Sequence, residues 1–215
     1  MESPAQLSAA LLPVPLDQAA DRTWLLAFQR DESAALNGLI ERWQRPLLSF
    51  AGRYLQNSAD AEDLVAETFA RLYQHRHRLR ADTRLSAWLF TTLTNLCHNH
   101  HRWRSRHPTI SLEAVPGPDP TGSSPGLALP LADRAPGPDA TLEHDESLAA
   151  VRSAVNALPH DLKVTVLLHH YERLSYHEIA VIAGCSERGV ETRLARARQQ
   201  LRKGLRGYLR ESKRD

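Results

Sequence analysis

Cysteine is nearly absent from this chain of 215 residues, which contains only Cys97 and Cys185. The two cysteines lie far apart and neither belongs to a Cys-x-x-Cys pair, so we expect no disulfide framework and predict a reducing cytoplasm. Long apolar runs are missing too, and none approaches the roughly 20 residues that a membrane-spanning helix needs. The N-terminal segment lacks a basic leader and carries Glu2, so it does not resemble a signal peptide.

The chain also lacks the alternation of apolar and polar residues that marks a β-strand. Apolar residues instead recur at steps of three and four from Leu36 to Tyr73, again over 85–104, and through the C-terminal third. Asn57 precedes an acidic stretch and is expected to cap the helix that begins there. The sequence therefore predicts an all-α protein.

Proline and glycine are concentrated in one stretch. Residues 107–142 hold 8 of the 13 prolines and 4 of the 10 glycines, with few large apolar residues to bury. We predict a flexible linker between two small helical domains. The expected division is an N-terminal extension (1–20), a first domain (21–106), a linker (107–146), a second domain (147–208) and a basic tail (209–215).

The net charge of +2 conceals an uneven distribution of charge. Residues 71–106 carry +7 and residues 188–214 carry +8, whereas residues 1–70 carry −5 and residues 107–187 carry −7. Solvated helix faces would explain either basic block alone. Both blocks together favour a polyanion that is held at two places, which indicates nucleic acid.

The segment from Ser175 to Leu205 has the signals of a helix-turn-helix. Ser175 and Glu178 form a capping box, Gly184 supplies the turn, and Ser186 caps a longer helix. The outward face of that helix carries Arg188, Thr192, Arg196, Gln199 and Lys203. An arginine fork and a hydroxyl are groups that read base edges in a major groove. We interpret this helix as DNA-binding rather than as an arginine-rich face of a protein-binding bundle.

A cluster of metal-ligand residue types, Cys97, His98, His100 and His101, lies on one predicted helix. Cys97 and His101 could begin a zinc site, but no second pair completes a tetrahedron. The Asn-His-His string is similar to a nuclease motif, yet no acidic metal ligand is near it in the sequence. We predict no metal site, no cofactor and no catalytic residue, and expect these histidines to contact phosphate or water.

Two groups of motifs resemble bacterial RNA polymerase sigma factors. The first group resembles region 2 and comprises residues 63–69 (DLVAETF), Trp88-Leu89, Asn95 and Asn99. The second group resembles region 4 and comprises Leu158-Pro159, residues 176–180 (YHEIA) and residues 190–198. A chain with only these two regions, covering 21–106 and 147–208, resembles the extracytoplasmic-function (group IV) class.

The resemblance implies a promoter-specificity subunit that binds core RNA polymerase, directs transcription initiation and catalyses no reaction. In the family, the acidic helix of region 2 docks on the coiled coil of the largest polymerase subunit. The residues at matching positions are Asp60, Glu62, Asp63 and Glu67. Ala66 stands where the family usually has glutamine, so one polar contact to the polymerase is in doubt.

The resemblance also assigns two sets of DNA-contacting residues. The set for the minus-ten element and its melting is Arg80, Arg84, Asn95, Asn99, Arg102 and Arg104. The set for the minus-thirty-five element is Arg188, Thr192, Arg193, Arg196 and Lys203. Gly189 and Glu191 depart from the family pattern, so the promoter sequence cannot be carried over from a relative. Trp88 is expected in the core, whereas Trp103 stays open between packing and base stacking.

The class usually works with a helical anti-sigma factor, which we expect as a partner together with core polymerase and promoter DNA. The chain is expected to act as a monomer on the polymerase, without membrane insertion, in the bacterial cytoplasm. Two alternatives remain at this point. One is a free-standing helix-turn-helix regulator whose N-terminal helices sense or dimerise. The other is a nuclease or another metal-dependent enzyme of nucleic acids.

Overall fold

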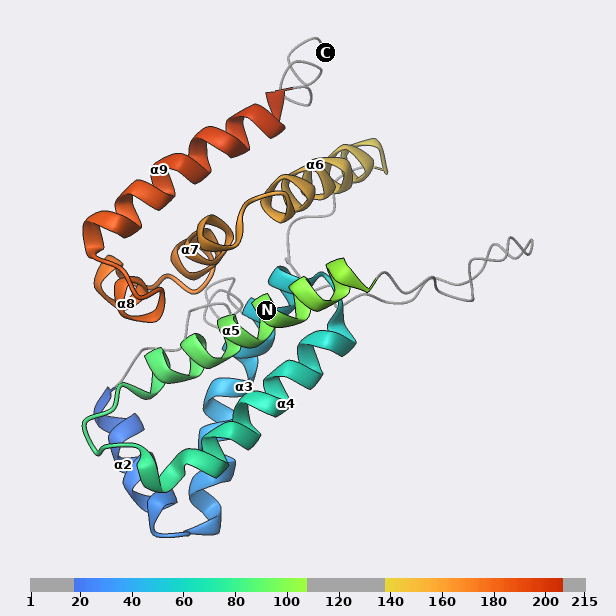
Figure 1. Cartoon of the computed structure of the whole chain (residues 1–215). Coiled ribbons are helices and arrows are strands. Elements are labelled where there is room, and N and C mark those ends of the chain that lie inside the picture. Colours follow the sequence, from blue (N-terminus) through green and yellow to red (C-terminus); the bar gives the residue numbers. More distant parts are fainter. Residues whose placement is uncertain (1–17, 108–137, 207–215) are drawn as a thin grey trace, which may run out of the picture.

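The computed structural model describes residues 18–107 and 138–206, with the backbone alone at Ser33 and at 138–146. The described residues form helices without a strand (Figure 1), which confirms the predicted all-α class. The helices of the first domain are α2 (Gln18–Gln29), α3 (Ser33–Leu55), α4 (Ser58–His75) and α5 (Leu85–Arg106), with a 3-10 turn η2 (Arg76–Arg78). Those of the second are α6 (Pro138–Asn156), α7 (His160–His170), α8 (Tyr176–Ile182) and α9 (Glu187–Gly204).

Aromatic side chains form the centre of the first domain. Trp43 and Phe50 on α3 both meet Phe90 on α5 edge to face, with ring centroids 6.3 and 5.8 Å apart. The Trp43 indole donates a hydrogen bond of 3.2 Å to the buried Asp21 carboxylate on α2. Burial of these large rings supplies much of the hydrophobic stabilisation of the bundle.

Helix α2 lies at the start of the first domain, for which the sequence predicted helices but gave an apolar pattern only from Leu36 onward; its Leu25 and Phe28 are buried in the core. The Asn57 cap was predicted correctly: its side chain accepts a hydrogen bond of 3.1 Å from the Asp60 amide at the start of α4. The predicted N-terminal extension, apart from the first residues of α2, and the basic tail lie outside the described residues.

The second domain contains the predicted helix-turn-helix, formed by α8 and α9. Ser175 and Glu178 complete the capping box, and the Ser186 hydroxyl accepts from the Gly189 amide at 3.1 Å. Gly184 in the turn has a φ of +59°, a left-handed conformation that glycine adopts without strain. These local signals in the sequence were correct.

One expectation about the start of this domain was wrong in detail. Helix α6 begins at Pro138, inside the stretch that was expected to be a non-helical linker, because proline suits the first position of a helix. The rest of the predicted linker, 108–137, lies outside the described residues.

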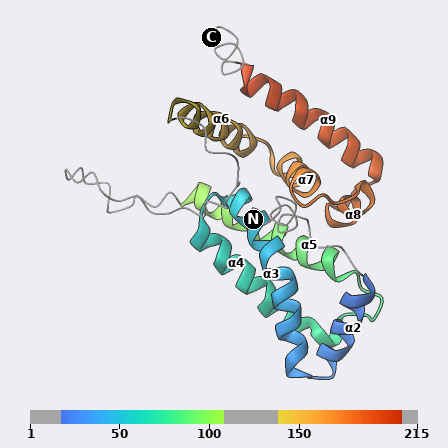
Figure 2. The same ribbon diagram turned by 180° about the vertical axis from the view of Figure 1, so that it is seen from behind.

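The two domains pack against each other, α7 on α3 and α8 on α5. Figures 1 and 2 show α7 and α8 between the first domain and α9, so α9 lies on the side away from the first domain. Buried apolar residues of both domains belong to one continuous cluster. The sequence predicted two domains on a tether and did not predict this contact.

Candidate polymerase and DNA interfaces

The acidic face of α4 is smaller than the sequence suggested. Asp60 is half-buried, and its carboxylate pairs with Arg104 at 2.5 Å and faces His100 at 3.7 Å. Glu67 pairs with Arg71 one turn along the helix at 2.8 Å.

Glu62 and Asp63 are exposed, and neither forms an ion pair with any other residue in the described ranges. The carboxylates open to a basic partner are therefore Glu62 and Asp63, with Glu67 beside them. Asp60 instead ties the start of α4 to the end of α5.

Two residues of the predicted minus-ten set, Arg80 and Arg84, lie in the segment that leads into α5. The Arg80 guanidinium donates two hydrogen bonds, of 3.0 and 3.3 Å, to the Asp82 carboxylate, and this contact lowers the pKa of the Asp82 carboxyl. Arg84 reaches His177 in the second domain, with 2.7 Å between Nη1 and Nε2. Arg84 lies eleven residues before Asn95, about 16 Å along the helix axis, so the structure separates these arginines from the asparagines.

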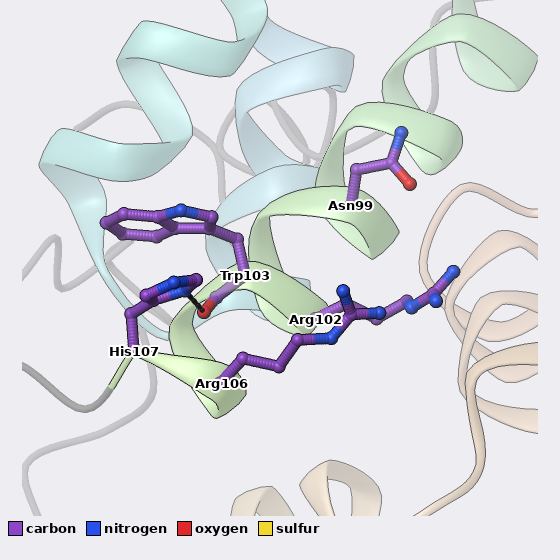
Figure 3. Close-up of a pocket in the computed structure, with 5 residues that line it drawn as sticks. All are labelled: Asn99, Arg102, Trp103, Arg106 and His107. Atoms are coloured by element: carbon purple, nitrogen blue, oxygen red, sulfur yellow. Dashed lines mark hydrogen bonds between the residues drawn. The ribbon is translucent and has the colours of Figure 1, made fainter.

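The other members of the minus-ten set follow one another along α5. Asn95 and Asn99 are exposed one turn apart, as predicted. A shallow hollow of about 290 Å³ continues this face toward the end of the helix. Its lining residues are Asn99, Arg102, Trp103, Arg106 and His107 (Figure 3). Arg104 points to Asp60 instead and does not join them.

The two tryptophans of α5 differ. Trp88 is partly buried against the core, with its ring 6.4 Å from that of His75, so the expectation of core packing was correct. Trp103 is 54% exposed and stacks on His107. The alternative of core packing that the sequence left open for Trp103 is therefore wrong.

Helix α9 presents Arg188, Thr192, Arg196 and Lys203 to solvent, as predicted. The Thr192 hydroxyl donates to the Arg188 carbonyl at 2.8 Å, which leaves its oxygen free to accept a hydrogen bond. Arg193 is turned inward by comparison, because its guanidinium pairs with Asp161 on α7 at 3.6 Å.

A second shallow hollow, of about 430 Å³, lies on the C-terminal half of α9. Its cationic lining residues are Arg198, Arg202, Lys203 and Arg206. Of these, only Lys203 was selected from the sequence. The four-residue spacing of Arg198, Arg202 and Arg206, which places them on one helix face, was a usable signal.

The cluster of cysteine and histidines on α5 is dispersed by the fold. Cys97 is fully buried, and burial raises the pKa of its thiol to about 12. His98 lies against His160 of α7, with ring centroids 4.0 Å apart, whereas His100 faces Asp60 and His101 lies beside Tyr54. Within 18–107 and 138–206, no three His, Cys, Asp or Glu side chains converge as metal ligands.

The contact between the domains contains ionisable groups that sequence reasoning missed. The buried Lys163 ammonium donates to the Tyr54 carbonyl at 2.7 Å and to the Asn156 side chain at 2.6 Å, and burial lowers its pKa to about 8. His160 Nδ1 lies 2.8 Å from the Tyr54 hydroxyl, and burial lowers the pKa of His160 to about 4. The signal in the sequence was the position of Lys163 within the apolar run of α7, which indicates that this charged side chain is buried.

Glu172 lies in the same contact. It accepts a hydrogen bond of 3.1 Å from the Ser49 hydroxyl on α3, and burial raises its pKa to about 7. Beside it, the Arg53 guanidinium lies 4.4 Å above the centre of the Tyr171 ring. The domains are thus joined by polar contacts as well as by apolar packing.

Comparison with known proteins identifies the family. Residues 39–107 match the family model of Sigma-70 region 2, and residues 148–201 match that of Sigma-70, region 4. The RNA polymerase sigma-H factor of Pseudomonas aeruginosa is 29% identical over 197 residues, which are 92% of this chain and all of that one. The ECF RNA polymerase sigma-E factor of Escherichia coli K12 is 28% identical over 186 residues, covering 86% and 94% of the two chains.

Solved structures share the fold. CnrH, in complex with the cytosolic domain of CnrY, has a TM-score of 0.63 and 22% identity over 87% of this chain and 98% of that chain. The sigma factor RpoE from Bartonella quintana, in complex with the anti-sigma factor NepR, has a TM-score of 0.56 and 24% identity over 79% and 96%. The chain belongs to the sigma-70 family, in its extracytoplasmic-function class, and is a promoter-specific sigma factor.

Among the helices of the described ranges, none combines the length and the apolar character that crossing a membrane requires.

Proposed function

We propose that three separate surfaces of this sigma factor carry its contacts in transcription initiation: α4 for core RNA polymerase, α5 for the minus-ten element, and α9 for the minus-thirty-five element. The observation that supports this division is the arrangement of charge. Uncompensated carboxylates lie on α4, whereas exposed cations and amides lie on α5 and, in the other domain, on α9.

Docking on the polymerase falls to Glu62, Asp63 and Glu67. Exposed carboxylates without a strong internal partner attract a basic surface, and such charges steer and orient association more than they add affinity. Asp60, which the sequence placed in this set, is proposed to contribute indirectly by holding the start of α4 against Arg104.

Promoter melting is assigned to the Asn95 and Asn99 face, supported by Arg102. Carboxamides offer both donors and acceptors to the edge of an extruded base, and guanidinium groups hold the backbone of the separated strand. Arg80 and Arg84 are proposed to reach DNA only after they leave Asp82 and His177, their partners in this structure.

Reading of the upstream element is assigned to the exposed face of α9. Arg188, Thr192 and Arg196 lie toward the N-terminal end of the helix, where base edges are read in a major groove. Lys203 follows toward the C-terminal end, where phosphate contacts suffice. Arg193 orients the helix through Asp161 in this arrangement, and its contact with DNA requires that pair to open.

The proposal extends to partners and location. The chain would act as a monomer on the polymerase in the bacterial cytoplasm, and the chemistry of RNA synthesis would belong to the polymerase. An anti-sigma factor is the expected regulator, since the similar RpoE of Bartonella quintana was solved in complex with one.

The decisive experiment is in vitro transcription with purified core polymerase, this protein and genomic fragments. We expect initiation at a limited set of sites, which would also define the promoter sequence. A free-standing regulator would instead bind duplex DNA without polymerase and would start no transcript.

Docking is tested with the double variant Asp63→Arg, Glu67→Arg, which should lose co-purification with core polymerase while its helical spectrum stays normal. The exposed Glu41 on α3 gives a control with a single charge reversal on another helix, Glu41→Arg, which should leave co-purification intact. Unchanged binding of the double variant would remove the docking assignment.

A further inference from the structure

The last turns of α5 hold an exposed aromatic pair. Trp103 is 54% exposed, the largest exposed fraction among the big apolar side chains that the structure describes. Its ring stacks on that of His107, with centroids 5.1 Å apart and an angle of 24° between the planes (Figure 3). His107 is held in turn by the Trp103 carbonyl, 3.0 Å from its amide and 3.1 Å from Nδ1. The pair is therefore ordered by the end of its own helix.

The groups around this pair are cationic or polar. Arg102 and Arg106, one turn apart, line the same hollow as Asn99 (Figure 3). Neither arginine forms an ion pair with a residue of the described ranges. An apolar protein helix would need aliphatic anchors, which this lining lacks.

Single-stranded nucleic acid, which carries both phosphates and flat bases, fits the hollow better than an apolar protein helix does. Proteins bind single-stranded nucleic acid by combining a cationic track for phosphates with aromatic platforms for bases. With half of its surface open and one face against His107, the indole has its other face available to a base.

The position of the pair places it next to the Asn95 and Asn99 face. Trp103 lies four residues and His107 eight residues beyond Asn99, about 6 and 12 Å along the helix axis, so the neighbour of a base held at Asn99 is within reach of the pair. The hollow is thus a direct continuation of the Asn95 and Asn99 face.

We propose that Trp103 and His107 form a stacking platform for one unpaired base of the promoter strand, next to the segment held by Asn95 and Asn99. Arg102 and Arg106 hold the phosphates on either side of that base. This assignment rests on the proposed role of α5 in melted DNA. It adds to that role a defined stacking site in which His107 and two arginines join Trp103, for which the sequence had left packing and base stacking open.

The test measures binding of the full-length protein to a fluorescein-labelled single-stranded 16-mer of mixed sequence and to its duplex. Trp103→Ala should weaken binding of the single strand about tenfold, because a stacked base is worth about that much or more, and should change duplex binding less than about twofold. Trp103→Phe, which keeps a flat ring, should restore most of the affinity. Arg102→Ala with Arg106→Ala should weaken both probes and flatten their salt dependence.

Tyr73→Ala is the matched control, since Tyr73 is 48% exposed but lies near the far end of α4. It should bind both probes like the unaltered protein. A second measurement does not depend on whether the alanine variant folds. Single-stranded DNA should quench the tryptophan emission of the unaltered protein, and it should quench the emission of Trp103→Phe much less.

Equal affinity of Trp103→Ala and the unaltered protein for the single strand, without quenching, would overturn the platform. The platform would also be overturned if Trp103→Ala bound single-stranded DNA normally and lost only its binding to core polymerase. These outcomes are independent of the transcription assay: failure of promoter-specific initiation would count against the proposed function, while the binding data would still decide for or against the stacking site.

Discussion

The two domains of this sigma factor build their cores from different residues. The first domain buries aromatic rings, with Trp43, Phe50 and Phe90 in edge-to-face contact at its centre. The second domain buries aliphatic side chains, and no aromatic residue between 147 and 206 is fully buried. The tyrosines in this range, Tyr171 and Tyr176, lie at the surface or only partly inside.

The difference teaches how each domain obtains its stability. Large rings bury much apolar area per residue, so the four-helix first domain closes its own core. The smaller second domain places part of its surface, including Lys163 and Glu172, against α3 of the first domain. We infer that the first domain is stable by itself and that the second gains stability from the contact, through groups whose charge depends on pH.

The largest effect should come from the aromatic core. Trp43→Ala should cost about 3–5 kcal/mol, because it leaves a cavity and removes the indole donor to Asp21. Denaturant unfolding followed by circular dichroism measures this loss. Trp103→Ala, at an exposed site, should stay within about 0.5 kcal/mol of the unaltered protein. Equal losses from the two substitutions would show that the rings do not dominate the first domain.

The parts of the structure that the sequence predicted are those that local chemistry determines. Asn57 and Ser186 cap their helices by bonding amides three residues ahead, and Gly184 takes the left-handed conformation that the turn needs. Asn95 and Asn99 were selected by the resemblance to sigma region 2, and their four-residue spacing places them on one face of α5. In each case the interacting residues are close together in the chain, so a short stretch of sequence is enough to predict the contact.

The missed features depend on partners far apart in the chain. Lys163 bonds a carbonyl 109 residues away, and Arg104 pairs with a carboxylate 44 residues away. A charged residue in a sequence is ordinarily taken as exposed, since burial of a charge is costly without a partner. The sequence does not show that partner, so the contact between the domains and the inward role of Asp60 could not be predicted.

The second prediction breaks the contact between the domains. Lys163→Met keeps the length of the side chain but leaves the Tyr54 carbonyl and the Asn156 oxygen without this donor. Loss of a buried partner costs about 1–3 kcal/mol, and the domains should separate more often. Thermal unfolding and small-angle X-ray scattering measure the two effects. The exposed Lys203→Met serves as the control and should change neither; unaltered scattering for both would mean that Lys163 does not hold the contact.

The third prediction concerns pH. Because the pKa of Glu172 is raised to about 7, its protonated form stabilises the folded protein fully below about pH 4.5, and this stabilisation is lost as the pH rises toward 7. Glu172→Gln should therefore gain about 1 kcal/mol at pH 7.5, or 2–4 °C in Tm, and nothing at pH 4.5. The amide oxygen can still accept from Ser49.

His160 acts in the opposite sense. Its lowered pKa of about 4 gives stability that is full above about pH 6.5 and is lost as the pH falls toward 4. Comparison of Glu172→Gln with the unaltered protein at each pH cancels this background. A gain of the variant that is the same at pH 4.5 and 7.5 would contradict the titration of Glu172 in the contact.

The smallest effects are expected within the second domain, where two glycines are each replaced by alanine in separate variants. Gly189 lies in the first turn of α9, and a Cβ there would meet Cys185 Cβ and Ser186 Oγ at 3.4 Å, an ordinary contact. Gly189→Ala should thus stabilise by about 0.5 kcal/mol, since alanine loses less backbone entropy in a helix. Gly184→Ala should destabilise by about 1 kcal/mol although its surroundings are open, because its φ of +59° strains alanine. Thermal unfolding at neutral pH measures both. Alanine keeps the amide that donates to the Ser186 hydroxyl, so a loss of stability at both sites would show that a Cβ at position 189 clashes with Cys185 or Ser186 in the first turn of α9.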